Sequence, residues 1–510
     1  MGNTWLNTLM RYVLSKRMRR IKYFSAHPDE VQSALLSQFI NTSRHTEWGK
    51  IHDFGSIKNP HQFAKNVPIQ DYETLKPYIN RMMHGEANVL WDGKVTWYSK
   101  SSGTTNDKSK YIPVTISNLK TCHLKGGWDT SALIYNARPD TKGFEGKMFL
   151  MGGTYDAFAP HPQTRIGDVS AIMIKHLPSV GNYIFAPSVD IAMMPNFEQK
   201  IETMAHALIK EDMRSLGGVP TWTVVLLQRI LEITGKKNIL EVWPNLQVYT
   251  HGGVSFMPYR ETFKQLIPKD DFIYWEIYNA SEGFFATQSE YGADDMLLLL
   301  NNGIYYEFLP ESEWYSTKPI AIPLSAVEVG KHYAPVITTN SGLWRYIVGD
   351  TVLFTSTKPY KIKVSGRTKQ FVNAFGEEVM VANTDKAISE TCTELGARVN
   401  EYTVAPVYFR GSKKGGHEWI VEFDREPPDM ETFNNTLDRN LQRINSDYEA
   451  KRFKDMAMER LKLRPVPRGT FHMWLKAKGK YGGQSKVPRL ANNRQYVEDI
   501  LTFLKIPSSR

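Results

Sequence analysis

Short strand-like runs alternate with long helical patterns from Lys147 onward, and this alternation limits the possible folds more than any other feature of the chain. Residues 147–153 (KMFLMGG), 246–253 (LQVYTHGG) and 271–284 (DFIYWEIYNASEGF) each read as a strand that runs into a glycine or serine turn. Strands that alternate with helices predict an α/β domain with a large sheet. Ligands of such sheets bind beyond the strand ends, where the loops gather.

Two helical patterns in this region are well defined. Residues 221–235 (TWTVVLLQRILEITG) predict a mostly buried helix that Gly235 caps at its C-terminus. An amphipathic helix is predicted by the spacings of 4, 3 and 4 between Phe197, Ile201, Met204 and Leu208.

The chain of 510 residues is too long for one ordinary core, so we expect two or three domains. The pattern changes near residue 366, and a smaller α+β pattern follows. There, residues 401–411 and 417–424 predict a β-hairpin. One long helix is predicted by the apolar stripe of Phe433, Leu437, Leu441, Ile444 and Tyr448. We therefore predict a large α/β domain of mixed sheets and helices over residues 1–366 and a smaller α+β domain over residues 367–510.

The distribution of charge along the chain bears on which ligands the protein can bind. Residues 451–490 hold 12 Lys and Arg against two acids, an excess as large as the net charge of +10 for the whole chain. A localised basic segment suits binding of phosphate or another anion as well as of nucleic acid. We expect small-molecule substrates, no nucleic acid and a monomer.

Cys122 and Cys392 cannot form a disulfide framework, and no apolar run approaches the ~20 residues of a membrane span, so we expect a cytoplasmic protein without stable membrane insertion.

Residues 98–115 (YSKSSGTTNDKSKYIPVT) hold a polar loop between two strand-like runs. Its hydroxyl and backbone N–H groups could surround a polyphosphate, because N–H groups in glycine-containing turns form anion-binding nests. The loop is not of the Walker type, since Lys108 stands where that pattern requires a second glycine. Taken alone, it is equally compatible with an ordinary Ser/Thr-rich turn.

Three further segments carry groups suited to a nucleotide. In YNASEG, Tyr278 can stack on a base and Glu282 can ligate Mg²⁺. Asp350 ends YIVGD and can accept hydrogen bonds from two ribose hydroxyls, and Lys486 lies in the glycine-rich turn GGQSKVPR. Each residue also has a purely structural interpretation: Tyr278 as core, Glu282 as surface, Asp350 as a turn residue and Lys486 as one basic residue among twelve.

The order of these segments resembles the adenylate-forming superfamily, and within it the GH3 family of acyl acid–amido synthetases. SSGTT resembles the phosphate loop of the family, YNASE its second motif and YIVGD its third. WPNLQVYTHGG is similar to the segment that leads into the base-binding turn, and GGQSKVPR to the C-terminal lysine turn. Two departures stand out. Ile347 occupies a position where the third motif usually has arginine, and the phosphate loop lacks its second glycine, which leaves the roles of Lys108 and Lys110 open.

The resemblance implies an ATP- and Mg²⁺-dependent ligase with a mobile lid over residues 367–510. A carboxylic acid would attack the α-phosphate of ATP and release pyrophosphate, and an amino acid amine would then attack the acyl adenylate and release AMP. Lys486 would be catalytic, and Glu282 would hold the metal. The nucleotide would be bound by Ser101, Ser102, Gly103, Thr104, Thr105, Gly252, Gly253, Tyr278, Ser281, Glu282, Asp350 and Arg367.

Two rival functions stay open at the level of sequence. A coenzyme A ligase shares the adenylation step but passes the acyl group to a thiol. A binding protein that has lost the chemistry is the second rival, although Glu282, Asp350 and Lys486 are all present. The acyl pocket could be lined by residues 221–231 and 152–168, which could equally be core and surface.

Overall fold

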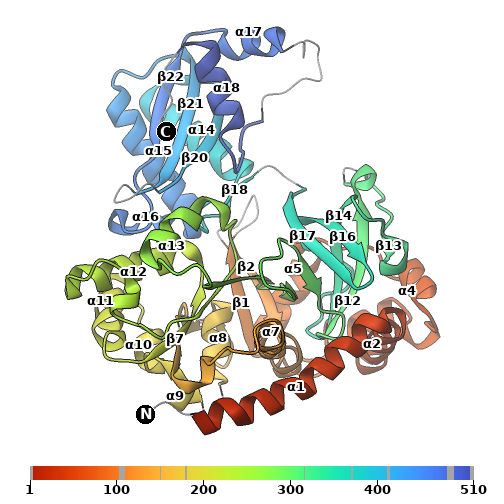
Figure 1. Ribbon diagram of the computed structural model, residues 1–510. Coiled ribbons are helices and arrows are strands. Elements are labelled where there is room, and N and C mark those ends of the chain that lie inside the picture. Colours follow the sequence, from red (N-terminus) through yellow and green to blue (C-terminus); the bar gives the residue numbers. More distant parts are fainter. Residues whose placement is uncertain are drawn as a thin grey trace.

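The computed structural model describes residues 4–102, 109–149, 151–177, 181–314, 316–368, 371–409, 414–478 and 488–505. Its N-terminal part is a large mixed α/β body, and its C-terminal part is a smaller α+β lobe that lies above that body in Figure 1. The predicted fold class is confirmed.

One large sheet runs through the body. In the described part of the chain it contains 13 strands in the order β13-β12-β14-β16-β17-β11-β10-β9-β8-β7-β3-β6, with β15 beside β14. Its strands are β3 (Lys147–Phe149), β6 (Phe185–Ala186), β7 (Met213–Gly218), β8 (Val248–His251), β9 (Ile273–Ala280), β10 (Gly283–Thr287), β11 (Met296–Leu298), β12 (Ile304–Pro310), β13 (Ile322–Pro323), β14 (His332–Thr339), β15 (Tyr346–Ile347), β16 (Asp350–Thr357) and β17 (Tyr360–Arg367).

The sheet has a parallel half and an antiparallel half that meet at β9. Strands β6, β3, β7, β8 and β9 are parallel to one another. From β9 onward, across β10, β11, β17, β16, β14 and β12 to β13, each strand is antiparallel to the next. Parallel strands place their carboxyl ends at one edge of the sheet. The turns after β3, β7, β8 and β9 therefore gather on one side of the body.

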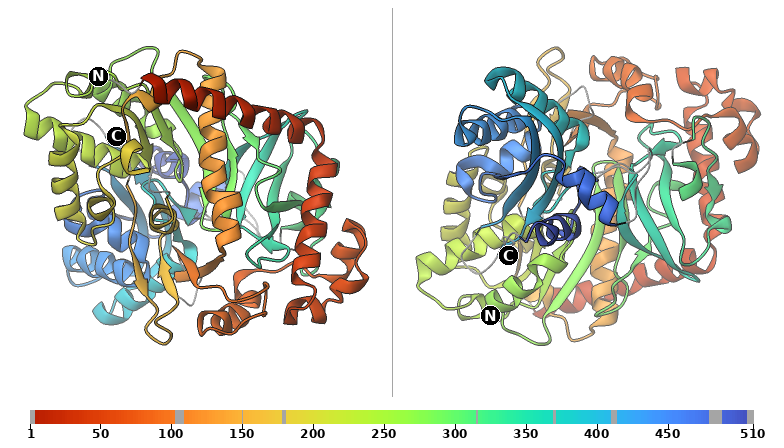
Figure 2. Two further views of the ribbon diagram at one scale, coloured as in Figure 1. Left: turned by 90° about the horizontal axis from the view of Figure 1, so that it is seen from below. Right: turned by 90° about the horizontal axis from the view of Figure 1, so that it is seen from above.

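Helices cover the sheet because each has an apolar face to bury. In Figure 2 α1 crosses α7 on the side away from the C-terminal lobe, while α11 and α12 lie together over the parallel half. The helices of the body are α1 (Thr4–Ala26), α2 (Pro28–Ser43), α3 (Glu47–Ile51), α4 (Pro60–Asn66), α5 (Tyr72–Met83), α6 (Ile116–Asn118), α7 (Leu124–Ala137), α8 (Val169–Lys175), α9 (Gly181–Ile184), α10 (Val189–Ala192), α11 (Phe197–Leu208), α12 (Pro220–Thr234) and α13 (Arg260–Leu266).

A second, smaller sheet carries the strands that flank the predicted phosphate loop. Its order is β2-β1-β5-β4, with β1 (Trp97–Ser102), β2 (Ser109–Val114), β4 (Tyr155–Ala157) and β5 (Arg165–Gly167). Strands β1 and β2 pair in antiparallel register from Trp97 opposite Val114 to Ser102 opposite Ser109. The Ser99 hydroxyl donates to the Ser281 hydroxyl at 3.0 Å, which ties β1 to the turn after β9 in the large sheet.

The C-terminal lobe is built on the sheet β20-β21-β22. Its elements are β18 (Phe371–Val372), β19 (Val379–Met380), β20 (Arg398–Val407), β21 (Gly416–Arg425), β22 (Lys462–Val466), α14 (Val381–Leu395), α15 (Met430–Ile444), α16 (Ser446–Arg452), α17 (Thr470–Ala477) and α18 (Gln495–Phe503). The predicted hairpin is the antiparallel pair β20 and β21. The Tyr259 hydroxyl donates to the Ala374 carbonyl at 2.6 Å, one of the contacts that joins the lobe to the body.

Local sequence signals predicted several elements correctly and one incorrectly. Helix α11 spans Phe197–Leu208. Helix α12 ends at Thr234 and is capped by Gly235, whose φ of 65° is the left-handed value that glycine adopts at low cost. The predicted single helix through Tyr448 is wrong, because α15 ends at Ile444 and α16 begins at Ser446. Asn445 separates them with an extended backbone, and its side-chain oxygen accepts from the Tyr448 N–H at 2.8 Å. The apolar stripe continues across this break, so periodicity alone did not reveal it.

Part of the basic segment serves the structure of the lobe. Arg452 forms an ion pair with Asp438 at 2.9 Å, and both side chains are buried. Arg464 pairs with the buried Glu418.

Among the described helices, none is long and apolar enough to cross a membrane.

Candidate active site

A cavity of about 2310 Å³ lies between the body and the C-terminal lobe. The turns after the parallel strands line it: Gly152 and Gly153 after β3, Val219 after β7, Gly252 and Gly253 after β8, and Ser281 and Glu282 after β9. A pocket of ~300–1,000 Å³ accommodates one drug-sized ligand. This cavity is large enough for a nucleotide together with further substrates.

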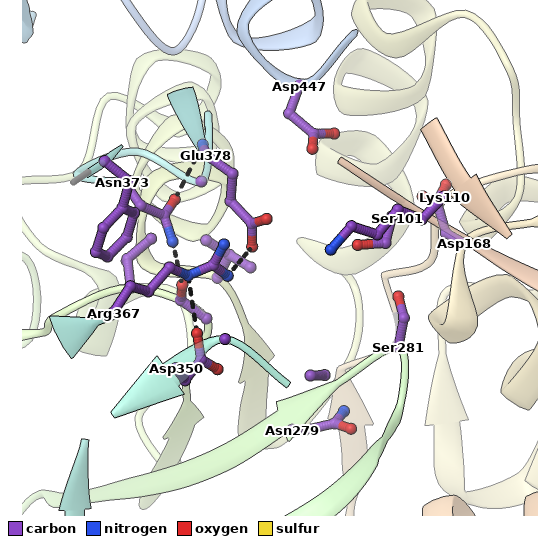
Figure 3. A pocket seen from close by; sticks show the side chains of 18 of the residues that line it. Ser101, Lys110, Asp168, Asn279, Ser281, Asp350, Arg367, Asn373, Glu378 and Asp447 are labelled. Carbon is purple, nitrogen blue, oxygen red and sulfur yellow. Dashed lines mark hydrogen bonds and ion pairs between the residues drawn. The ribbon is translucent and has the colours of Figure 1, made fainter. Parts of the chain in front are cut away.

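The ends of β1 and β2 that flank the predicted phosphate loop reach this cavity. Ser101 at the end of β1 and Lys110 at the start of β2 both line it, and Figure 3 shows their side chains close to Ser281. Ser102 is the last residue of β1, and its side chain lies outside the described structure. Gly103, Thr104, Thr105 and Lys108, as well as the predicted catalytic Lys486, also lie outside the described residues.

Tyr278, Asp350 and Arg367 form one network across three strands. The Tyr278 hydroxyl donates to Asp350 Oδ2 at 2.7 Å, and Arg367 Nε lies 2.8 Å from Asp350 Oδ1. Tyr278 is 7% and Asp350 9% exposed, yet both residues line the cavity. Each carboxylate oxygen of Asp350 therefore has one internal donor, and further lone pairs are available to a ligand. The structure assigns Tyr278 a contact that sequence reasoning missed: its hydroxyl orients Asp350.

Glu378 from the C-terminal lobe extends the network. Arg367 lies 3.3 Å from Glu378 Oε1, and the Glu378 N–H donates to the Asn373 side chain (Figure 3). Burial opposes the charge on Arg367, but Glu378 and Asp350 outweigh it and raise the pKa of the guanidinium. Arg367 thus stays cationic where the lobe meets the body.

Glu282 is a buried carboxylate at the same cavity wall. It is 6% exposed, so its interpretation as a surface residue is wrong. Burial raises the pKa of Glu282, the cation of Lys110 lowers it, and the carboxylates of Asp350 and Glu378 raise it again. A desolvated carboxylate among other carboxylates gains stability from a cation. Among the described residues no group of three His, Cys, Asp or Glu side chains forms a complete metal cage. This combination fits Mg²⁺ carried in by a nucleotide, which needs one or two protein carboxylates and takes its other ligands from phosphate and water.

The two glycines after β8 have separate structural reasons. A Cβ on Gly252 would lie 2.4 Å from the Ile277 carbonyl oxygen, so this turn can approach β9 only with glycine. Gly253 has φ +82° and accepts a hydrogen bond from Asn373 Nδ2 at 3.0 Å through its carbonyl. Both glycines line the cavity.

The two segments considered for the acyl pocket each contribute to the cavity. Residues Gly152, Gly153, Thr154 and Asp168 line it from the loop, and Trp222 lines it from the first turn of α12. The Trp222 ring lies 3.9 Å from the ring of Phe197, measured between centroids. One face of α12 is core, with Val224, Leu227 and Ile230 fully buried.

Several charged residues at the cavity were missed by the sequence analysis. They are Lys200, Glu378, Asp447 and Lys451. Lys200 is buried and donates to the Gly152 carbonyl, and burial lowers the pKa of Lys200 to about 8. None of these residues lies in the sequence motifs on which the family resemblance was based. Their common role at the cavity wall arises only from tertiary folding.

The fold is that of adenylate-forming ligases. The structure is similar to "GH3.15 acyl acid amido synthetase", with a TM-score of 0.61 and 18% identity over 96% of both chains. It is also similar to 2-hydroxyisobutyryl-CoA ligase in complex with 2-HIB-AMP and CoA, with a TM-score of 0.57 and 14% identity over 94% of this chain and 92% of that one.

Sequence comparison defines the family. Residues 17–272 match the GH3 family N-terminal domain, residues 297–367 the GH3 family central domain and residues 382–495 the GH3 family C-terminal domain. The chain belongs to the GH3 family. It is 23% identical to indole-3-acetic acid-amido synthetase GH3.3 of Arabidopsis thaliana over 93% of this chain and 91% of the relative. It is 22% identical to 4-substituted benzoates-glutamate ligase GH3.12 of the same plant over 92% of this chain and 94% of the relative. The predicted family and the predicted class, an acyl acid–amido synthetase, are confirmed.

Proposed function

We propose that this protein uses ATP and Mg²⁺ to convert a carboxylic acid into an acyl adenylate, and then transfers the acyl group to the amine of an amino acid. The observation that carries this proposal is convergence. Segments that are far apart in the chain, around Ser101, Gly252, Tyr278, Asp350 and Arg367, meet at one cavity at the carboxyl ends of parallel strands.

Each predicted nucleotide residue has a role that its chemistry supports. Asp350 would accept hydrogen bonds from the ribose hydroxyls through the lone pairs that Tyr278 and Arg367 leave unused. Gly252 and Gly253 would let the base approach the backbone of the β8 turn. The phosphates would be surrounded by Ser101, Ser102, Gly103, Thr104 and Thr105, with Ser281 beside them. Glu282 would ligate Mg²⁺, which lowers the electrostatic cost of bringing a carboxylate to the phosphates.

Adenylation gathers negative charge on phosphate oxygens, so it requires fixed cations and N–H donors more than acid–base groups. The substrate carboxylate forms a bond to the α-phosphorus, and pyrophosphate leaves with the electrons of the broken P–O bond. Lys110 and Arg367 supply positive charge at the described part of the cavity. We further propose that Lys486 supplies the remaining cation, brought in by a mobile lid over residues 367–510.

The acid should have an apolar or aromatic body. Met151, Met194, Phe197, Val219 and Trp222 line the cavity, which supports such a substrate. The names of the relatives agree with this, since they include indole-3-acetic acid and 4-substituted benzoates. Burial of an aromatic ring there would supply binding free energy through apolar contact.

The test is an acid-dependent exchange of pyrophosphate into ATP, followed by product analysis with amino acids and with coenzyme A in parallel. We expect exchange with an aromatic or other apolar acid, AMP as the nucleotide product, and an amide. Asp350→Ala should weaken ATP binding by about tenfold or more, because a charge-assisted hydrogen bond contributes ~1.5–3 kcal/mol. Asp294→Ala is the matched control, since it removes an exposed carboxylate that pairs with Lys363. Stoichiometric ADP would refute adenylation, and a thioester formed at a comparable rate would favour a coenzyme A ligase.

Lys486 has a separate test based on the two half-reactions. Lys486→Ala should slow acid-dependent exchange by roughly 10²-fold, as expected for loss of one electrostatic donor at the reacting phosphate. Amide formation from supplied acyl adenylate should largely survive. Small and equal losses in both half-reactions would reduce Lys486 to a surface charge.

A further inference from the structure

Helix α16 presents a carboxylate and an ammonium group from the C-terminal lobe to the cavity. Asp447 and Lys451 are four residues apart on this helix and both line the cavity. Side chains at positions i and i+4 lie on one face of a helix, with Cβ atoms ~5–6 Å apart. In Figure 3 the Asp447 carboxylate points from the lobe into the space above Ser101 and Lys110. The two charges therefore face the cavity side by side.

Lys451 is a buried cation held by an aromatic ring. It is 9% exposed, and its Nζ lies 4.7 Å from the centre of the Trp222 ring. Burial lowers the pKa of Lys451, although the carboxylates of Asp447, Glu377, Asp168 and Glu378 act in the opposite direction. Among the described residues, no hydrogen bond or ion pair within 4.0 Å satisfies its ammonium. A buried ammonium gains from an anionic partner.

Asp447 is suited to accept a proton near neutral pH. Burial and the neighbouring Glu378 raise its pKa to about 6, while Lys451 lowers it. Asp168 and Lys100 from the body also face this carboxylate. A base whose pKa is just below the working pH is ionised and still basic enough to take a proton.

We propose that α16 carries the site of the acceptor amino acid: Lys451 binds its α-carboxylate, and Asp447 binds its ammonium and takes the proton that must leave before attack. The pair is complementary to a zwitterion, which requires one cation and one anion at short separation. The acceptor is accordingly an α-amino acid and not a simple amine. This inference rests on the proposed function and assigns residues to its second step.

The proton and bond changes balance as follows. The ammonium gives one proton to Asp447, and the free lone pair on nitrogen forms a C–N bond to the acyl carbon. The C–O bond to AMP breaks, and its electron pair stays on the AMP phosphate oxygen. The second proton on nitrogen leaves to water, and Asp447 then releases its own proton to the solvent.

The side chain of Trp222 has a place in this arrangement. It belongs to the body, whereas Lys451 belongs to the lobe, so their contact depends on how the lobe sits on the body. The ring faces the ammonium by a cation–π contact, which fixes the cation without neutralising it. The charge of Lys451 is thus available to a substrate carboxylate.

The first experiment compares Lys451→Met with wild type, using as acceptors an amino acid and its carboxamide, which lacks the negative charge. Wild type should prefer the amino acid. In Lys451→Met the KM for the amino acid should rise about tenfold or more, the preference should vanish, and acid-dependent pyrophosphate exchange should persist. Lys451→Arg should restore part of the preference because it keeps the cation. Lys454→Met is the matched control, since Lys454 is an exposed lysine that pairs with Glu198 outside the cavity.

The second experiment tests Asp447→Asn. Amide formation should fall by roughly 10²-fold at neutral pH, with pyrophosphate exchange retained. In wild type the rate of amide formation should rise through pH about 6 as Asp447 ionises, and this step should be absent from the variant.

Two results would overturn the inference: an unchanged KM and preference in Lys451→Met, or equal loss of both half-reactions in Asp447→Asn. If wild type shows no exchange with any acid, the proposed function itself fails, which is a different outcome from failure of this site.

Discussion

Tyr278→Phe separates two roles for the aromatic residue of the second motif. If Tyr278 only stacks on the base, phenylalanine keeps the ring and ATP affinity should not change. If its hydroxyl orients Asp350, the variant loses the 2.7 Å hydrogen bond to Asp350 Oδ2 and the ribose acceptor is left less firmly held. The structure favours the second role, because Tyr278 is buried and its hydroxyl is directed at the carboxylate.

The expected loss of ATP affinity in Tyr278→Phe follows from the charge of the hydrogen-bond acceptor, Asp350. A hydrogen bond to a charged group contributes ~1.5–3 kcal/mol, and every ~1.4 kcal/mol changes an equilibrium constant tenfold. If the whole contribution reaches the bound nucleotide, the Kd for ATP should rise about 10- to 150-fold. Arg367 still holds Asp350 Oδ1 at 2.8 Å, so we expect the lower part of this range.

The assay is calorimetric titration with ATP and Mg²⁺, together with denaturant unfolding of each variant. Tyr306→Phe is the matched control, because Tyr306 is also fully buried and its hydroxyl has no hydrogen-bond partner among the described residues. The control should bind ATP as wild type does. A Kd for Tyr278→Phe within twofold of wild type would refute the orienting role and restore the stacking interpretation.

Three further predictions concern stability. Arg345→Met should lower the free energy of unfolding by about 3–5 kcal/mol in denaturant titration, because it leaves Glu307 buried without its two 2.8 Å hydrogen bonds; a loss below ~1 kcal/mol would contradict this. Gly126→Ala should lower the free energy of unfolding by ~1–3 kcal/mol, since the new Cβ would lie 2.3 Å from the Phe284 ring. Gly127→Ala is the control: its Cβ would meet nothing within 4 Å, so it should raise the free energy of unfolding by ~0.5–1 kcal/mol. Equal effects of the two variants would argue against the close contact. Burial opposes ionisation of Glu377, but His417 at 2.7 Å and backbone N–H groups outweigh this effect and lower the pKa of Glu377. The ionised carboxylate therefore stabilises the fold above the ordinary carboxyl pKa of ~4.3, and this stabilisation is lost as the pH falls through the lowered pKa. Glu377→Gln should therefore be less stable than wild type at pH 7, and the difference should shrink on acid titration; a difference independent of pH would contradict the linkage.

Local features of the sequence were sufficient for the elements whose information is local. The spacing of Phe197, Ile201, Met204 and Leu208 predicted α11, and Gly235 marked the end of α12, because apolar periodicity and a left-handed cap depend only on residues close in the chain. The alternation of strands and helices indicated the large sheet. Resemblance to family motifs, and not composition or spacing, brought Ser101, Tyr278, Glu282 and Asp350 together as a candidate site.

Tertiary structure alone decided the contacts within that site. Tyr278 and Asp350 are 72 positions apart, and only the pairing of β9 through β10, β11 and β17 to β16 sets their atoms at hydrogen-bond distance. Asp447 and Lys451 read in sequence as polar positions on an ordinary helix, and the break at Asn445 was hidden by a continuous apolar stripe. The pKa of Asp447 and the position of the Lys451 ammonium depend on burial beside Glu378 and Trp222, which come from other parts of the fold. Burial and the electrostatic field of neighbouring groups depend on which elements fold over one another, and a single sequence does not contain that arrangement in any local pattern.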